Sequence, residues 1–190
     1  MKTKDFIQVE ITSVKELREW LEKNHTQKES VWLVTYKKST IEKYVARSDI
    51  IDILLCFGWV DGILRVLDDE KTMHFVSPRQ TQYWTRMYKD RYAKLLKDGA
   101  VNTAGVAAEA KSKELGLWDF MDDVDDLIVP TDLEGALTKI KATTTFSDLN
   151  DSYKRNLLRY IKLAKTKPTR QKRIETIVNH TARGERIKNM

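Results

Sequence analysis

One short stretch of the chain, residues 56–84, gathers side chains of the kinds that bind small ligands. The candidates are Trp59, Asp61, Arg65, His74, Arg79 and Trp84. An arginine can hold a carboxylate or phosphate through two parallel hydrogen bonds, and an indole ring offers a flat apolar wall. Such a set predicts a face that binds an aromatic or sugar-like ring bearing an anionic group.

Each of these residues has an expected role. The two tryptophans would form apolar walls, Arg65 and Arg79 would clamp the anion, Asp61 would orient the ligand and His74 would donate a proton. The alternative is structural: Asp61 forms an ordinary ion pair with Arg65 or Arg79, and the tryptophans belong to the core. Under the ligand-site interpretation, Arg79→Ala leaves folding mostly intact and abolishes binding, whereas unfolding of that variant would mark the arginine as structural.

A β-hairpin is expected to position these residues. Residues 58–67 and 71–78 alternate around the polar turn Asp68-Asp69-Glu70, so successive side chains point to opposite faces. We expect these opposite pairs: Leu67 and Thr72, Val66 and Met73, Arg65 and His74, Leu64 and Phe75. One face would then carry the core residues Leu64, Val66, Met73 and Phe75, and the other would carry Trp59, Asp61, Ile63, Arg65, His74 and Val76.

The rest of the sequence predicts an α+β fold. A capping box at Ser13 and Glu16 begins a first helix, residues 31–37 read as a strand, and Ser48 caps an apolar helix that ends at Gly58. We expect a small antiparallel sheet of about three strands with packed helices, followed by a largely helical C-terminal half. The expected later helices are 85–97, 103–115, 132–140, 151–164 and 168–183, with a short helical piece at 118–121.

Composition limits the class of protein. The chain has 190 residues, 41% of them hydrophobic, with one cysteine and only seven glycines and three prolines. These values indicate a globular, helix-rich protein without an internal disulfide. No leader or membrane-spanning run is evident, so we expect a cytoplasmic protein.

Charge is distributed unevenly along the chain. Residues 114–134 contain eight acids and no Lys or Arg, whereas residues 151–190 carry a net charge of +9. The sequence therefore predicts an α+β part at 1–125 and a basic helical segment at 126–190, which is either part of the same compact unit or a small second domain. The basic residues of this segment would balance the acidic stretch.

The basic segment also offers a candidate anion site. Lys165, Lys167 and Arg170 surround the predicted start of the last helix, where backbone N–H groups favour anions. Together with Lys172 and Arg173 they form the alternative hypothesis, a nucleic-acid-associated protein. No helix-turn-helix pattern or aromatic platform supports base readout, so nucleic acid ranks below a small-molecule or peptide ligand.

Catalysis is left open by the sequence. A second alternative is an enzyme that uses the same hairpin face, with His74 or Asp61 within reach of a substrate. The three histidines are far apart and the single cysteine has no partner, so we expect no metal site and no cofactor. The oligomeric state is not predicted.

Several ordered blocks resemble the YdeI/OmpD-associated family of bacterial proteins, also called bacteriocin-protection proteins. The blocks are Tyr36-Lys37-Lys38, Cys56-Phe57-Gly58-Trp59-Val60-Asp61-Gly62, Ser77-Pro78-Arg79, Trp84, the Gly99 to Gly105 stretch, Pro130-Thr131-Asp132-Leu133 and the Lys/Arg-rich run 164–174. The resemblance extends over nearly the whole chain and implies resistance to toxic peptides or envelope stress, with no reaction or cofactor. The segment between Pro78 and Trp84 is one residue shorter than usual, and Thr85 and Tyr88 stand where Ser and Asn are common.

Overall fold

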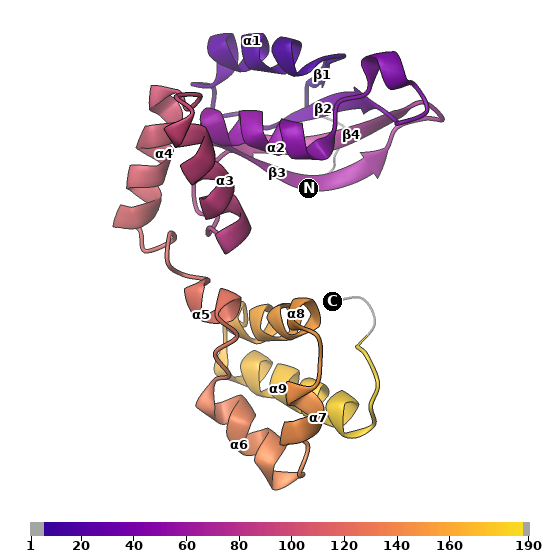
Figure 1. Ribbon diagram of the computed structural model, residues 1–190, viewed down its shortest axis with the longest axis vertical. Coiled ribbons are helices and arrows are strands. Elements are labelled where there is room, and N and C mark those ends of the chain that lie inside the picture. Colours follow the sequence, from indigo (N-terminus) through magenta and orange to yellow (C-terminus); the bar gives the residue numbers. More distant parts are fainter. Residues whose placement is uncertain (1–5, 188–190) are drawn as a thin grey trace. The chain divides into compact units, whose positions relative to one another are not determined.

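The computed structural model describes residues 6–187, which divide into two compact units between Phe120 and Met121. The first unit contains the sheet and the second is helical (Figure 1). The predicted α+β class is confirmed. The division falls a few residues before the boundary expected from the charge pattern.

The sheet of the first unit has four strands among the described residues, in the order β1-β2-β4-β3. The strands are β1 (Gln8–Glu10), β2 (Val31–Tyr36), β3 (Trp59–Val66) and β4 (Lys71–Pro78). β1 runs parallel to β2 and the other pairs are antiparallel, so the sheet is mixed. β1 was not predicted because three residues carry too little alternation to mark a strand.

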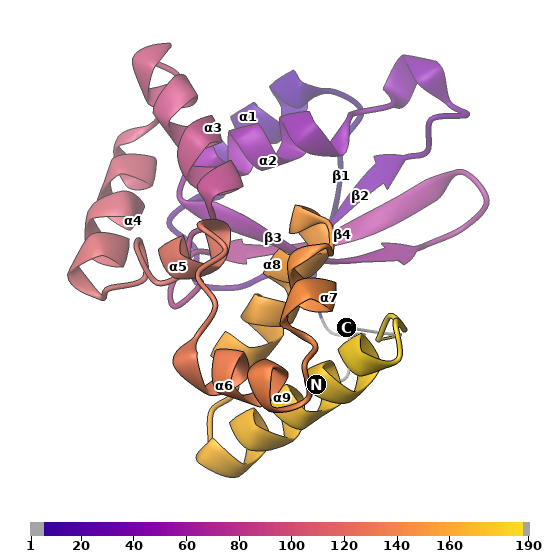
Figure 2. The same ribbon diagram turned by 60° about the horizontal axis from the view of Figure 1, so that its bottom comes forward.

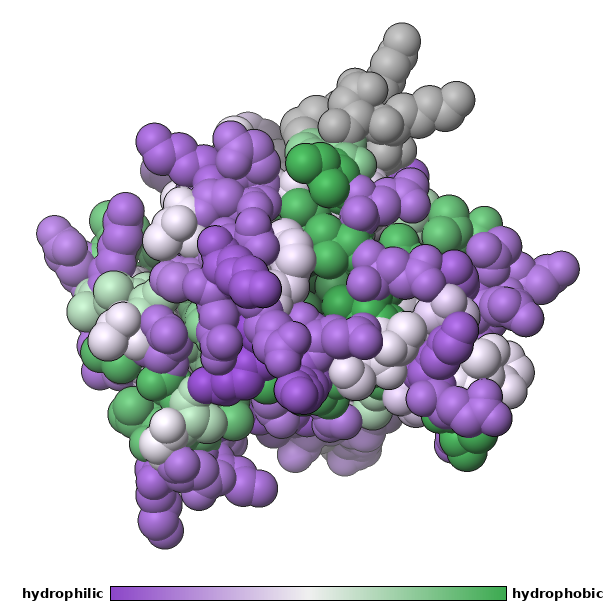
Figure 3. Space-filling view, turned by 90° about the horizontal axis from the view of Figure 1, so that it is seen from above, coloured by the Kyte–Doolittle hydropathy of each residue, from purple (hydrophilic) through white to green (hydrophobic). Residues whose placement is uncertain are grey.

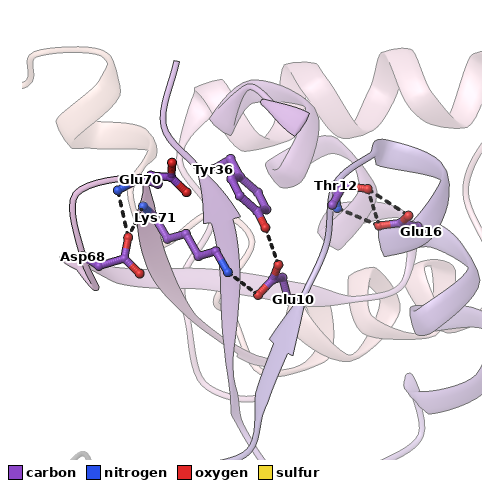
Figure 4. Close-up of polar contacts among 7 residues, drawn as sticks. All are labelled: Glu10, Thr12, Glu16, Tyr36, Asp68, Glu70 and Lys71. Atoms are coloured by element: carbon purple, nitrogen blue, oxygen red, sulfur yellow. Dashed lines mark hydrogen bonds and ion pairs between the residues drawn. The ribbon is translucent and has the colours of Figure 1, made fainter. Parts of the chain in front are cut away.

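Two helices cover one face of this sheet (Figures 1 and 2). They are α1 (Val14–Asn24) and α2 (Arg47–Cys56), and their buried faces pack on β2, β3 and β4. The predicted cap of α1 is confirmed, because the Ser13 hydroxyl accepts a hydrogen bond from the Glu16 amide at 3.2 Å. The Glu16 carboxylate reaches back to the Thr12 amide at 2.6 Å (Figure 4). The cap predicted at Ser48 is wrong, since α2 begins at Arg47 after Ala46.

The remaining elements of the first unit are the 3-10 turn η1 (Ile41–Lys43), α3 (Arg86–Lys97) and α4 (Thr103–Glu114). α4 approaches the end of α2 closely. A Cβ added to Gly105 would lie 2.5 Å from the Cys56 carbonyl oxygen, and one added to Gly58 would lie 2.7 Å from Ala108 Cβ. Gly58 also has a φ of +69°, so glycine is needed there on both grounds.

The hairpin between β3 and β4 differs from the predicted register by one residue. Leu64 lies opposite His74 and Val66 opposite Thr72, and a bulge interrupts the pairing between Asp61 and Leu64. The bulge adds a residue on β3, which moves every side chain beyond it to the other face. Beyond the bulge, Leu64 and Val66 share a face with His74 and Val76. The predicted core face is wrong: His74 and Val76 are buried, whereas Leu64 is 48% exposed and Val66 69% exposed.

The second unit packs five helices among the described residues: α5 (Asp122–Asp125), α6 (Thr131–Lys139), α7 (Thr143–Ser147), α8 (Asp151–Lys162) and α9 (Lys167–Ala182). Its buried side chains include Leu133, Leu157, Ile161, Ile174 and Ile177. The Thr166 hydroxyl caps α9 and Pro168 stands in its first turn. The short helix expected at 118–121 is wrong; the acidic residues 122–125 form the helix instead.

Candidate functional site

A pocket of about 290 Å³ opens on the helix-covered face of the first unit, near the end of the sheet where η1 and the hairpin lie. It is lined by residues from β2, the segment between η1 and α2, β3 and β4: Thr35, Tyr36, Lys37, Lys38, Tyr44, Val45, Arg47, Leu64, Thr72 and His74. No acidic residue lines the pocket. Three cations and two phenol rings therefore face one small volume.

His74 is the central polar group of this pocket. It is only 6% exposed, and its imidazole makes no hydrogen bond to any of the residues that the structure describes. Burial, and secondarily the nearby cation of Arg47, lower its pKa below the ordinary value of 6.5, while Asp61 opposes this shift. The ring nitrogens of His74 are not among the fully buried atoms without a partner in the described residues, so they retain access to the pocket and are available to a ligand.

Arg47 lies at the pocket wall and is anchored from behind. Its Nη2 donates a 2.7 Å hydrogen bond to Asp61, whose side chain is 3% exposed, while its own side chain is 55% exposed. Tyr88 of α3 donates to the other carboxylate oxygen of Asp61 at 2.6 Å. Burial and the bond to Asp61 raise the pKa of Tyr88, so this phenol remains protonated and a donor. Asp61 thus fixes Arg47 at the pocket wall, and Asp61 itself does not line the pocket.

The lysines of the pocket follow directly after β2. Lys37 Nζ donates to the Asp68 carbonyl at 2.8 Å, which ties it to the hairpin turn. Lys38 has no ion-pair partner among the described residues. With Arg47 they make the rim of the pocket positive, and anions are favoured there.

Tyr36 forms part of the wall and is fixed from the opposite side (Figure 4). Its hydroxyl donates to Glu10 at 2.6 Å, and Lys71 donates to the other oxygen of the same carboxylate at 2.7 Å. These bonds lower the pKa of Glu10, first through Lys71 and then through Tyr36. Lys43 and Lys71 each lie 4.9 Å from the Tyr36 ring centroid. The contacts across three strands hold the ring in one orientation.

Arg79 and Trp84, both predicted to bind a ligand, lie in a sealed aromatic cluster instead. The Arg79 guanidinium stacks on Trp84, with Cζ 4.2 Å from the ring centroid, and donates weakly to the carbonyls of Gln82 and Tyr83. Arg79 is 7% exposed, and burial lowers its pKa to about 10. Trp84 in turn packs on Trp118 at 4.8 Å. Neither residue lines a described pocket.

Trp59 and Arg65 are separated from the pocket. Trp59 is 1% exposed, packs edge-on against Trp20 and donates its indole N–H to the His25 carbonyl. Arg65 pairs opposite Met73, and its guanidinium lies over Trp32, 5.5 Å from the ring centroid. Of the six predicted residues, the structure brings His74 to the pocket and Asp61 behind it.

The basic residues of the second unit are partly neutralised by its acids. Arg170 forms a two-bond pair with Asp132 at 2.6 and 2.9 Å, and Lys162 pairs with Asp123. Lys165 and Lys167 are exposed at the start of α9. The balance expected between the acidic stretch and the basic segment is therefore present in the pairs Lys162–Asp123 and Arg170–Asp132.

Sequence reasoning missed Arg47, Lys38 and Tyr44. The prediction that α2 begins at Ser48 left Arg47 in a loop, and its partner Asp61 lies on another element. The run Tyr36-Lys37-Lys38 could have indicated this site. A strand that ends in a tyrosine and is followed by two lysines places positive charge beside a flat aromatic ring.

Neither a metal site nor a membrane span is found in the part of the chain that the structure describes. Its His, Cys, Asp and Glu side chains form no group of three or more that could hold a metal ion. No helix within residues 6–187 is both long and apolar enough to cross a membrane. Hydrophilic side chains cover most of the face seen in Figure 3, and hydrophobic ones are visible between them.

Comparison with protein families assigns each unit a separate match. A model described as a domain of unknown function (DUF8412) matches residues 9–108, and a model described as bacteriocin-protection, YdeI or OmpD-associated matches residues 126–184. The second match confirms the family resemblance in that part of the chain, while the blocks around Gly58 fall within the first match. No curated protein and no solved structure matches the chain.

Proposed function

Because the chain belongs to the family of the domain of unknown function DUF8412 and carries a bacteriocin-protection, YdeI or OmpD-associated segment, we propose that it is a toxin-resistance protein that binds a small anionic ligand. The binding site in this proposal is the His74 pocket. The observation that carries it is the buried imidazole without a hydrogen-bond partner, placed among Lys37, Lys38 and Arg47. We place the protein in the cytoplasm, in keeping with its free, buried thiol at Cys56.

The pocket favours an anion that carries a planar or apolar ring. Tyr36, Tyr44, Val45 and Leu64 supply apolar surface, and the cations lie at the rim. A volume of about 290 Å³ is at the small end of ligand sites, so the ligand would be a compact metabolite. His74 is neutral near pH 7, because burial lowers its pKa, and it can donate one hydrogen bond to the ligand.

Calorimetric titration with benzoate and phenyl phosphate tests this proposal, with neutral benzamide as the matched probe. We expect both anions to bind and benzamide to bind much more weakly. His74→Gln and Lys38→Gln should each weaken anion binding by roughly tenfold, since a hydrogen bond to a charged group is worth about 1.5–3 kcal/mol.

Lys28→Gln provides the control, because Lys28 is an exposed lysine of the same unit outside the pocket. Equal losses of anion affinity in Lys28→Gln and Lys38→Gln would show that the overall charge of the protein, and not the pocket, attracts the anion. If benzamide bound as well as benzoate, the pocket would not select anions. In cells exposed to a bacteriocin, His74→Gln should lower survival relative to the unchanged protein if the ligand site serves resistance.

A further inference from the structure

A second cavity, of about 310 Å³, lies on the surface of the helical unit. It is lined by Asn156, Arg159, Tyr160 and Leu163 of α8 and the loop after it, and by Arg173 of α9. The four residues from the α8 side stand at helical spacings of three and four, so they share one face. All five lining residues belong to the second unit.

Arg159 is the unexplained residue of this groove. It is half-buried, and its Nε is fully buried without a hydrogen-bond partner among the described residues. An unsatisfied buried donor on a charged group is costly, more so than on a neutral one. An anion bound at the outer nitrogens of this guanidinium would offset part of this cost, because its charge acts on the whole group.

Arg173 is held in a fixed position opposite. Its Nη1 donates to the Tyr160 carbonyl, and its Cζ lies 4.3 Å from the centroid of the Tyr160 ring. These contacts leave the remaining donors of the guanidinium without a carboxylate partner in the described part of the chain. A guanidinium fixed in this way loses little conformational entropy when it binds an anion.

The neighbouring cations contrast with this pair. Arg170 is bonded to Asp132, Lys162 to Asp123 and Lys154 to Asp151. Arg159 and Arg173 have no such acid, and no acid lines the groove. Two guanidinium charges are therefore concentrated in one concave site, which favours a ligand with more than one negative charge.

We propose that this groove binds the phosphate group of a phosphate monoester. A monoester carries close to two negative charges at neutral pH and three acceptor oxygens, which match the two guanidiniums of the groove. The volume admits the phosphate together with a small organic group. A nucleic-acid backbone is a phosphodiester with a single charge per phosphate, and the binding test separates it from a monoester.

The test uses the full chain with adenosine monophosphate and inorganic phosphate as probes, and adenosine as the probe that lacks the phosphate. In a nitrogen-15 NMR spectrum, we expect both phosphates to shift the Arg159 Nε–H signal and adenosine to leave it in place. Arg159→Gln should weaken binding of adenosine monophosphate by about tenfold or more. Lys172→Gln is the control, because it removes one exposed charge from α9 outside the groove, and it should change affinity less than about twofold.

Two results would overturn the proposal. Equal weakening in Arg159→Gln and Lys172→Gln would mean that the charge of the unit as a whole attracts phosphate. A single-stranded 12-nucleotide DNA that binds through Arg159 when neither phosphate probe binds would assign the groove to a phosphodiester backbone instead. Arg173→Lys keeps the charge but not the planar fork, so it should bind adenosine monophosphate more weakly than the unchanged protein. Its melting temperature should stay the same, which shows that the lost affinity is not a loss of fold.

Discussion

At the scale of single residues, Arg79 shows how a charged side chain can be part of a core. Its guanidinium lies between the Trp84 and Tyr88 rings, at 4.2 and 5.6 Å from their centroids, and two of its nitrogens have no hydrogen-bond partner among the described residues. The π faces of the rings compensate part of the cost of burying the charge. The contacts of this arginine are therefore those of a packing residue.

Truncation of Arg79 should accordingly reduce stability. We expect Arg79→Ala to lower the free energy of unfolding by about 2–4 kcal/mol, through the lost cation–π contact and the cavity left behind. Arg79→Met keeps most of the volume and removes the buried charge, so it should cost about 1 kcal/mol or less. Urea denaturation followed by tryptophan fluorescence measures both, and an Arg79→Ala variant that is fully stable but no longer binds benzoate would restore the ligand-clamp role.

His74 predicts a pH dependence whose sign is fixed by burial. In the unfolded protein His74 binds a proton near pH 6.5. In the folded protein its pKa is lower, so it binds the proton only at a more acidic pH. Protons therefore favour the unfolded state, and the protein should lose stability as the pH falls below about 6.5, until the folded form is protonated as well. Melting temperatures between pH 7.5 and 5.5 should decline less steeply in His74→Gln. An identical slope in both proteins would show that other groups set the dependence.

At the scale of the elements, the close approach of α4 to α2 has a matched pair of tests. Gly105→Ala would place a Cβ 2.5 Å from the Cys56 carbonyl oxygen, whereas a Cβ at Gly135 in α6 meets nothing within 4 Å. The first substitution should cost about 2 kcal/mol or more, because backbone must move. The second should stabilise its unit by about 0.5–1 kcal/mol, because alanine favours the helix.

The stability changes caused by Gly105→Ala and by Gly135→Ala can be measured separately. All five tryptophans, at positions 20, 32, 59, 84 and 118, belong to the first unit. Tryptophan fluorescence should report the loss in Gly105→Ala, and circular dichroism the gain in Gly135→Ala. If Gly105→Ala were as stable as the unchanged protein, the contact between α2 and α4 would be looser than 2.5 Å implies.

The elements also show what could be predicted from the sequence. Local signals were sufficient for the Ser13 cap and for the hairpin turn at Asp68. The site required information that is not local. A single bulge near Gly62 shifted the hairpin faces, and Arg47 and Asp61 meet only because α2 packs on β3. Alternation within one strand cannot reveal a bulge, and helix periodicity cannot identify a partner on another element.

At the scale of the whole molecule, the first unit extends beyond its family match. Trp118 lies outside residues 9–108, yet it packs on Trp84 and Tyr92, and the Trp84 amide donates to the Leu117 carbonyl at 3.0 Å. The match therefore ends before the aromatic cluster is complete. The structural unit closes at Phe120.

Fragments of the chain test this boundary. A fragment of residues 1–120 should unfold cooperatively, with the fluorescence transition of a packed tryptophan cluster. A fragment of residues 1–108 lacks Trp118 and should melt at a clearly lower temperature and bind a hydrophobic dye such as ANS, because Trp84 and Tyr92 lose a neighbour. Equal melting temperatures for the two fragments would show that α4 beyond Ala108 and the Trp118 segment add nothing to the fold of the unit.

The division at Phe120 and Met121 also has a consequence for inheritance. The two family matches lie on either side of it, at residues 9–108 and 126–184, and each side has its own core. A genetic exchange at the junction of Phe120 and Met121 would leave the core of each half intact. Each half would then carry its own properties into the new chain, so a property established for one half is not evidence for the other.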